Sequence, residues 1–381
     1  MRVSRRSEVD PFIVMDVMEA ARVEESKGRH IIHMEVGQPS TGAPKGAIDA
    51  LSTAMQTDAL GYTVALGLPA LRERIAQMYQ EWYGVTVSPN RIVITAGSSA
   101  AFQLAFISLF DAGERVAIGD PGYPSYRNIL KALDLDVVGI QTTHKGRFQP
   151  EVQDLPNDLS GLLVASPANP TGTMLDHDAL KALIDHCHAR DVAFISDEIY
   201  HGIEYGKKAV TALEISDDVY VINSFSKYFS MTGWRIGWMV VPQDHVRRVE
   251  RLVQNLFICA PHAAQVAALA ALDCDDELQE NLSEYTRNRD FLLQELPKAG
   301  FDKIAPPDGA FYIYADVSDM TDDSVELCKD ILLEAGVSVT PGVDFDPVRG
   351  HQTLRFSYAR SYDDIVEGVR RLQDWYAKRA P

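Results

Sequence analysis

The 381-residue chain has few cysteines and lacks long apolar runs. Its four cysteines, Cys187, Cys259, Cys274 and Cys328, are widely spaced and form no CxxC pair, which argues against a disulfide framework or a zinc site. No stretch reaches the roughly 18 apolar residues of a membrane span, and no apolar signal region follows the N-terminal arginines. We therefore expect a cytoplasmic protein with reduced cysteines and no metal site.

Basic residues are scarce relative to acidic ones. The 36 Lys+Arg and 54 Asp+Glu give a formal net charge of −18, which disfavours nucleic acid or an anionic membrane as a partner. Any anionic ligand must then be held by local arginines. The chain also lacks GxxxxGK[ST] and GxGxxG loops, so the sequence does not indicate a nucleoside triphosphate or a dinucleotide.

The apolar fraction of 46% and charged fraction of 24% are ordinary globular values, and the length exceeds that of a typical single domain. Strands alternate with helices from about residue 45 to 290, which predicts an α/β domain with a mostly parallel sheet covered by helices. Short strands around one helix follow residue 300. We expect a large domain of residues 45–290 and a small α+β domain of residues 1–44 and 291–381.

The most informative stretch is Ser224–Trp238, SFSKYFSMTGWRIGW, which follows the apolar run Val219–Ile222. It places Lys227 after a predicted strand, where open α/β sheets bind ligands. Its aromatic and apolar neighbours would desolvate the amine, lower its pKa and make it a nucleophile toward carbonyls. Arg235 follows eight residues later, and with the nearby serines it suits a phosphate beside the amine. A solvated surface lysine is the plain alternative.

Two other strand ends carry candidate ligand groups. The predicted strand Ile92–Thr95 runs into a glycine turn and a helix, whose N-terminal N–H groups could bind a phosphate at Ser98 and Ser99. The predicted strand Val192–Ile195 is followed by SDEIY. Burying the Asp197 carboxylate at the end of this strand costs free energy unless it pairs with a cation. Asp197 could instead cap a helix.

These motifs, with NPTG at 169–172, PGYPSY at 121–126 and LRFSYA at 354–359, resemble class I/II aminotransferases. These are pyridoxal-phosphate (PLP) enzymes of the aspartate-aminotransferase fold, fold type I. The resemblance implies a large domain with a mostly parallel sheet of the seven-stranded type, covered by helices, and a small α+β domain. The resemblance implies that Lys227 forms the internal aldimine with the cofactor. It also implies that Asp197 keeps the pyridine nitrogen protonated, and that Tyr200 bonds the phenolic oxygen.

The same resemblance assigns the contacts to the cofactor ring and the substrate. Tyr123 would stack on the pyridine ring, although a turn tyrosine packed on its own loop is the alternative. Asn169 would donate to the phenolic oxygen and lie beside the substrate. The loop with Gly37 would cover the substrate carboxylate, which Arg355 would bind, because a planar guanidinium suits bidentate carboxylate binding.

For the phosphate, the resemblance implies contacts from Ser98, Ser99, Ser224 and Arg235. It adds the hydroxyl of Tyr62, in a YTxxxGxxxLR context, from the neighbouring subunit. We therefore expect a homodimer whose two active sites are shared.

The expected reaction is transamination between an amino acid and a 2-oxo acid, with Lys227 as general base. A PLP-dependent carbon–sulfur β-lyase or a related elimination or synthase reaction on the same fold is one alternative. A binding or regulatory protein without catalysis is another, although intact Lys227, Asp197 and Arg235 argue against it. We find no second arginine of the kind that dicarboxylate-specific members use, which favours a neutral or aromatic amino donor.

Overall fold

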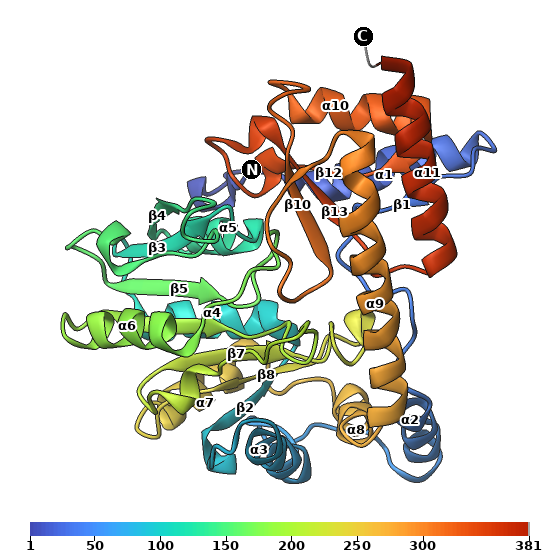
Figure 1. Ribbon diagram of the computed structural model, residues 1–381. Coiled ribbons are helices and arrows are strands. Elements are labelled where there is room, and N and C mark those ends of the chain that lie inside the picture. Colours follow the sequence, from blue (N-terminus) through green and yellow to red (C-terminus); the bar gives the residue numbers. More distant parts are fainter. Residues whose placement is uncertain (380–381) are drawn as a thin grey trace.

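A seven-stranded sheet forms the centre of the larger part of the molecule in the computed structural model, which describes residues 1–379 (Figure 1). β8 runs antiparallel to both of its neighbours, and all other neighbouring pairs are parallel. The prediction of a mostly parallel sheet is confirmed. Across the sheet the strands are β2 (Ile92–Thr95), β8 (Gly237–Val240), β7 (Tyr220–Ser224), β6 (Ala193–Asp197), β5 (Gly161–Ala165), β3 (Arg115–Asp120) and β4 (Asp136–Gln141).

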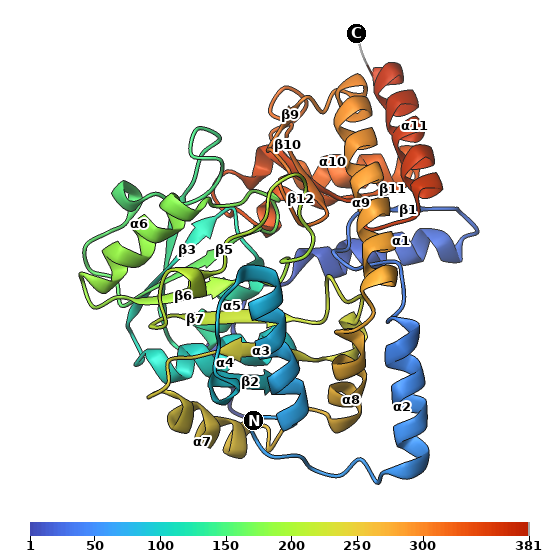
Figure 2. The same cartoon turned by 60° about the horizontal axis from the view of Figure 1, so that its bottom comes forward.

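Both faces of this sheet are buried, because alternate residues of each strand pack on different helices. In β2, Val93 belongs to one hydrophobic core, and Ile92 and Ile94 belong to the other. The helices of the Val93 face are α4 (Gly97–Leu109), α5 (Pro124–Ala132) and α7 (Val246–Leu256). Those of the opposite face are α3 (Pro69–Tyr83), α6 (His177–His188) and α8 (His262–Ala271), and Figure 2 shows the layers from a second side.

A smaller part is built around a four-stranded antiparallel sheet of β12 (Thr340–Pro341), β13 (Thr353–Ser357), β10 (Tyr312–Asp316) and β9 (Lys303–Ile304). Both chain ends contribute to it, since β1 (Ile32–His33) pairs with β11 (Val337–Ser338). Its helices are α1 (Ile13–Ser26), α10 (Ser324–Asp330) and α11 (Tyr362–Arg379). The helix α9 (Asp275–Glu295) runs from the large part to this one (Figure 1).

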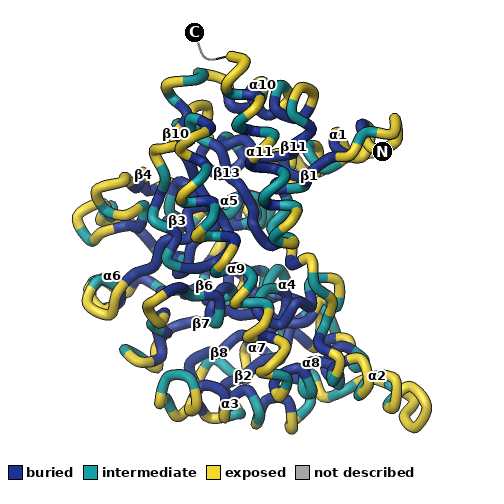
Figure 3. The backbone as a smooth tube through the Cα atoms, turned by 45° about the vertical axis from the view of Figure 1, so that its right-hand side comes forward, coloured by how far each residue is buried: buried dark blue, intermediate teal, exposed yellow. Residues whose placement is uncertain are grey.

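α2 (Lys45–Thr57) packs on α8 at the end of the large part away from the small one (Figures 1 and 2). The strands of both sheets are largely buried, and exposed residues concentrate on α2, the N-terminal segment and the loops (Figure 3). Within residues 1–379, no helix has the length and apolarity needed to cross a membrane. The same residues contain no group of three or more His, Cys, Asp or Glu side chains that could hold a metal ion.

Candidate active site

A cavity of about 550 Å³ lies where the carboxyl ends of the parallel strands face the small part. This edge is where open α/β sheets bind ligands, because the loops that leave parallel strands there converge. Ten of the twelve residues that the sequence singled out line the cavity: Gly37, Ser98, Ser99, Tyr123, Asn169, Asp197, Tyr200, Lys227, Arg235 and Arg355. Ser224 and Tyr62 do not line it.

Lys227 follows the end of β7 by three residues, and its Nζ donates a 2.6 Å hydrogen bond to the backbone oxygen of Gly37. Burial, together with the nearby cations Arg355 and Arg235, lowers the pKa of the Lys227 amine to about 7, and Asp197 opposes this shift. A large share of the amine is therefore neutral near pH 7, which is its nucleophilic form.

Asp197 ends β6 and is buried at the cavity wall. Burial raises the pKa of its carboxyl group to about 6, against the opposing effects of the Tyr126 hydroxyl, the Ile199 N–H and Lys227. Tyr126 donates to Oδ2 and the Ile199 N–H donates to Oδ1 at 3.1 Å. A buried carboxylate that still faces the cavity suits a cationic N–H group.

An anion cradle lies at the start of α4. Gly97 has a φ of +75°, and a Cβ added there would overlap the guanidinium of Arg235. The arginine therefore lies directly against the helix N-terminus, where Ser98 and Ser99 line the cavity. Free N–H groups at a helix N-terminus and a fixed guanidinium together suit a phosphate.

Two of the predicted phosphate contacts, Ser224 and Tyr62, lie outside the lining of the cavity. The hydroxyl of Ser224 donates to the Ile236 oxygen at 3.0 Å and accepts from the Ser226 N–H at 3.2 Å, so it is used within the loop. Ser226 lines the cavity in its place. Tyr62 is 83% exposed, and its predicted contact with a neighbouring subunit stays a prediction.

Arg355 projects from β13 into the cavity with its guanidinium held on several sides. Nη1 donates to Asn169 Oδ1 at 2.8 Å, and Nη2 donates to the backbone oxygen of Glu35. The guanidinium carbon lies 4.4 Å from the centre of the Tyr312 ring and 4.6 Å from that of Phe345. This support fixes the orientation of the group that the sequence assigned to a carboxylate.

Three cavity residues at the start of α1, namely Phe12, Val14 and Met15, were not expected from the sequence. Asp344 of the small part holds this turn, because its carboxylate accepts from the Ile13 N–H at 2.9 Å and the Val14 N–H at 3.3 Å. The ring of Phe12 also meets that of Tyr123 edge to face, with centroids 5.9 Å apart. The N-terminal segment thus forms an apolar wall of the cavity.

The fold is that of a class I/II aminotransferase. The chain belongs to the family described as "Aminotransferase class I and II", whose model matches residues 29–372, and it is a transaminase. The resemblance read from the sequence is thereby confirmed, as are the fold type and the reaction class.

Relatives match along nearly the whole chain. A crystal structure of a putative aminotransferase from Silicibacter pomeroyi is 64% identical with a TM-score of 0.95, and the match covers 100% of both chains. The valine–pyruvate aminotransferase of Mycobacterium tuberculosis is 47% identical over 98% of each chain. Aspartate aminotransferase from Thermus thermophilus with maleate is 28% identical with a TM-score of 0.92, over 98% of this chain and 100% of that one. These names favour transamination over the β-lyase alternative.

Proposed function

We propose that this transaminase uses PLP and transfers the amino group of a neutral aliphatic amino acid, of the valine type, to a small 2-oxo acid such as pyruvate. The observation that supports the donor class is the composition of the cavity wall. It combines one carboxylate-binding arginine, Arg355, with the apolar turn at Phe12, Val14 and Met15.

The residues present fit PLP. The cradle between Gly97 and Arg235 suits its phosphate, Asp197 suits a protonated ring nitrogen, and the Lys227 amine suits covalent attachment. Tyr123 would stack on the ring, and Asn169 with Tyr200 would bond the phenolic oxygen. When bound, PLP supplies an electron sink for negative charge that develops at the donor's Cα.

The protein's own side chains then have separate tasks. Arg355 binds and orients the donor's α-carboxylate, since its guanidinium is already fixed by Asn169 and Glu35. Lys227 Nζ, once free, would remove the proton from the donor's Cα and deliver it to carbon C4′ of the cofactor. Its lowered pKa suits that task near neutral pH. Asp197, as an anion, stabilises the ring nitrogen's positive charge.

The donor's side chain would lie against the N-terminal wall. Among the described residues that line the cavity, the cations are Lys227, Arg235 and Arg355, and each already has a task. A second carboxylate on the donor would then have no cation of this chain to pair with. Burying that unpaired charge in the cavity would cost free energy. The name of the relative from Mycobacterium tuberculosis supports a branched donor and pyruvate.

We also propose the assembly that the sequence suggested: a large domain of residues 45–290, a small domain of residues 1–44 and 291–381, and a homodimer that shares its sites through Tyr62. The exposure of Tyr62 supports a contact with another subunit. Light scattering at assay concentration tests the dimer, because full activity in a monomer would contradict a shared site.

The four free cysteines support a cytoplasmic location.

A screen of amino donors tests the proposed substrate. PLP-loaded enzyme would be assayed with valine, alanine, phenylalanine, aspartate and glutamate, each with pyruvate and with 2-oxoglutarate. We expect the highest kcat/KM for valine with pyruvate and the lowest for the two dicarboxylates. Preference for aspartate would overturn the donor class, and release of ammonia from cysteine without an oxo acid would support the lyase alternative.

A further inference from the structure

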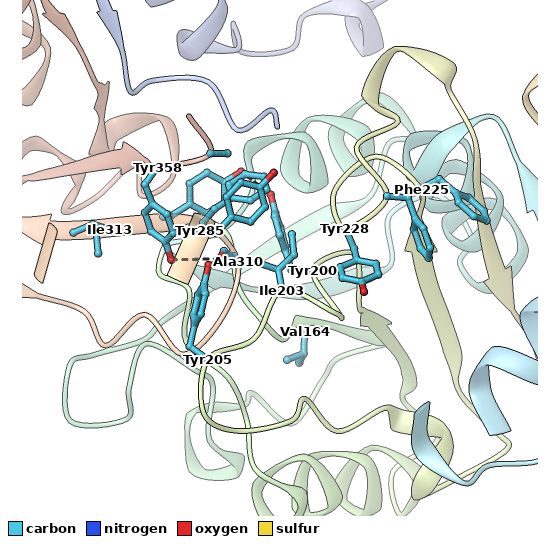
Figure 4. Close-up of a cluster of buried hydrophobic side chains, with 14 of the residues drawn as sticks. Val164, Tyr200, Ile203, Tyr205, Phe225, Tyr228, Tyr285, Ala310, Ile313 and Tyr358 are labelled. Carbon is cyan, nitrogen blue, oxygen red and sulfur yellow. Dashed lines mark hydrogen bonds between the residues drawn. The ribbon is translucent and has the colours of Figure 1, made fainter. Parts of the chain in front are cut away.

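Two buried tyrosine hydroxyls meet at the cavity wall. The Tyr312 and Tyr200 oxygens lie 2.6 Å apart, and neither hydroxyl has another hydrogen bond within residues 1–379. Tyr200 belongs to the turn after β6 and to the same buried hydrophobic cluster as Tyr205, Tyr285 and Tyr358 (Figure 4). Tyr312 comes from β10 of the small sheet, so this hydrogen bond crosses between the two parts of the molecule.

The position of the Tyr312 hydroxyl is fixed by its surroundings. Its ring lies 4.4 Å from the guanidinium carbon of Arg355 and meets the Tyr200 ring edge to face, with centroids 5.6 Å apart. The hydroxyl occupies the space beside Gly37, where an added Cβ would overlap it. Because the ring is held on these sides, the Tyr312 hydroxyl has few possible hydrogen-bond partners other than Tyr200.

The direction of this hydrogen bond follows from the task proposed for Tyr200. Burial raises the pKa of both hydroxyl groups, so both keep their protons at neutral pH. A hydroxyl has one proton to donate and two lone pairs that accept. If the Tyr200 proton goes to the phenolic oxygen of the cofactor, the proton between the two tyrosines must come from Tyr312.

We propose that Tyr312 is a positioning residue that acts on the cofactor through Tyr200, by donating to it and strengthening the hydrogen bond that Tyr200 gives to the phenolic oxygen. Chains of hydrogen bonds polarise one another in this way. The inference rests on the proposed use of PLP, and it adds a residue that the sequence did not single out.

The consequence is spectroscopic. In the PLP-loaded enzyme, the phenolic oxygen would share a proton with the nitrogen that would link the cofactor to Lys227. A stronger hydrogen bond to that oxygen draws its electrons away from the shared proton, which is then lost at lower pH. Loss of the Tyr312 hydroxyl should therefore raise the pH midpoint at which the absorbance of the bound cofactor changes.

The test is an absorbance titration of PLP-loaded Tyr312→Phe, which keeps the ring beside Arg355. We expect the midpoint to rise by about 0.5 to 1 pH unit, the size set by one hydrogen bond. Tyr314→Phe is the matched control, because it removes a buried hydroxyl of the same strand that bonds Thr353 at 2.7 Å. The control should titrate like the parent.

A double variant tests whether the effect passes through Tyr200. In a Tyr200→Phe background, Tyr312→Phe should produce no further shift. A shift that persists there would overturn the proposed route, and a parental midpoint in the single variant would overturn the proposal itself.

Replacing Tyr312 with a difluorotyrosine supplies a second test that keeps the hydroxyl. Because the fluorinated hydroxyl is more acidic and donates a stronger hydrogen bond, it should move the midpoint of the absorbance titration down. A parent protein that takes up no PLP chromophore would instead refute the proposed function.

Discussion

The guanidinium of Arg235 occupies the space that a side chain on Gly97 would fill. The glycine therefore serves two needs, a φ of +75° at the start of α4 and a close approach of the arginine. In the proposed function, both needs serve the phosphate of the cofactor.

Gly97→Ala should consequently weaken PLP binding. The new Cβ is strained at this φ and displaces Arg235, so we expect the dissociation constant, measured by fluorescence titration, to rise about tenfold or more. Gly113→Ala is the matched control, since Gly113 has a φ of +87° and open space around it. Equal losses of affinity in the two variants would show that backbone strain alone explains the effect.

Asp197→Asn should leave the cofactor attached but slow the removal of the Cα proton by about a hundredfold or more, because the ring nitrogen loses its anionic partner. Single-turnover absorbance measurements with excess donor follow that step. Tyr126→Phe, which removes one hydrogen bond from the same carboxylate, should reduce the rate only about two- to tenfold. A parental rate in Asp197→Asn would contradict the assigned role.

The lowered pKa of Lys227 has a consequence for the stability of the cofactor-free protein. The folded state holds this proton up to about pH 7, whereas the unfolded chain holds it up to the ordinary 10.5. Burial of the charged amine thus costs stability below pH 7, and the cost fades as pH rises from 7 to 10.5. Lys227→Met should increase the free energy of unfolding at pH 6 by at least about 1 kcal/mol. Urea unfolding at pH 6 and pH 10 measures it, and an equal gain at both would contradict the electrostatic origin.

Asp344→Ala should raise the KM for valine about fivefold, because the apolar turn at Phe12 and Val14 loses its two hydrogen bonds to the carboxylate. The absorbance spectrum of the bound cofactor should stay unchanged. Asp323→Ala is the control: Asp323 caps α10 through the Val325 and Glu326 N–H groups, so its loss should lower stability without altering KM. An unchanged KM in Asp344→Ala would show that the turn does not contact the donor.

The sequence predicted the strand ends well, because apolar runs that stop at a polar residue mark buried parallel strands. Asp197 is the last residue of such a strand and Lys227 follows another by three residues, and the structure brings both to one cavity. β4 was missed because it is an edge strand in which Asp136, Gly139 and Gln141 interrupt the apolar pattern. α5 was missed because its first residues belong to a Pro- and Gly-rich motif typical of turns.

Several site residues could not be predicted, since their positions depend on contacts between distant segments. Tyr312 and the Phe12 turn reach the cavity only when the small part packs against the large one. Ser224 and Ser226 both flank the same lysine, and their hydrogen bonds in the loop decide which of them faces the cavity. Tyr126 offered a weak signal, because it lies three residues after Tyr123.

The most direct test of the proposed active site is the identity of the lysine that holds the cofactor. PLP-loaded enzyme would be reduced with borohydride, digested and mapped by mass spectrometry, with Lys227→Ala treated in parallel. We expect a phosphopyridoxyl label on Lys227, no label in the variant, and loss of turnover in that variant without loss of fold. A label on a different lysine, or turnover that survives in Lys227→Ala, would contradict it.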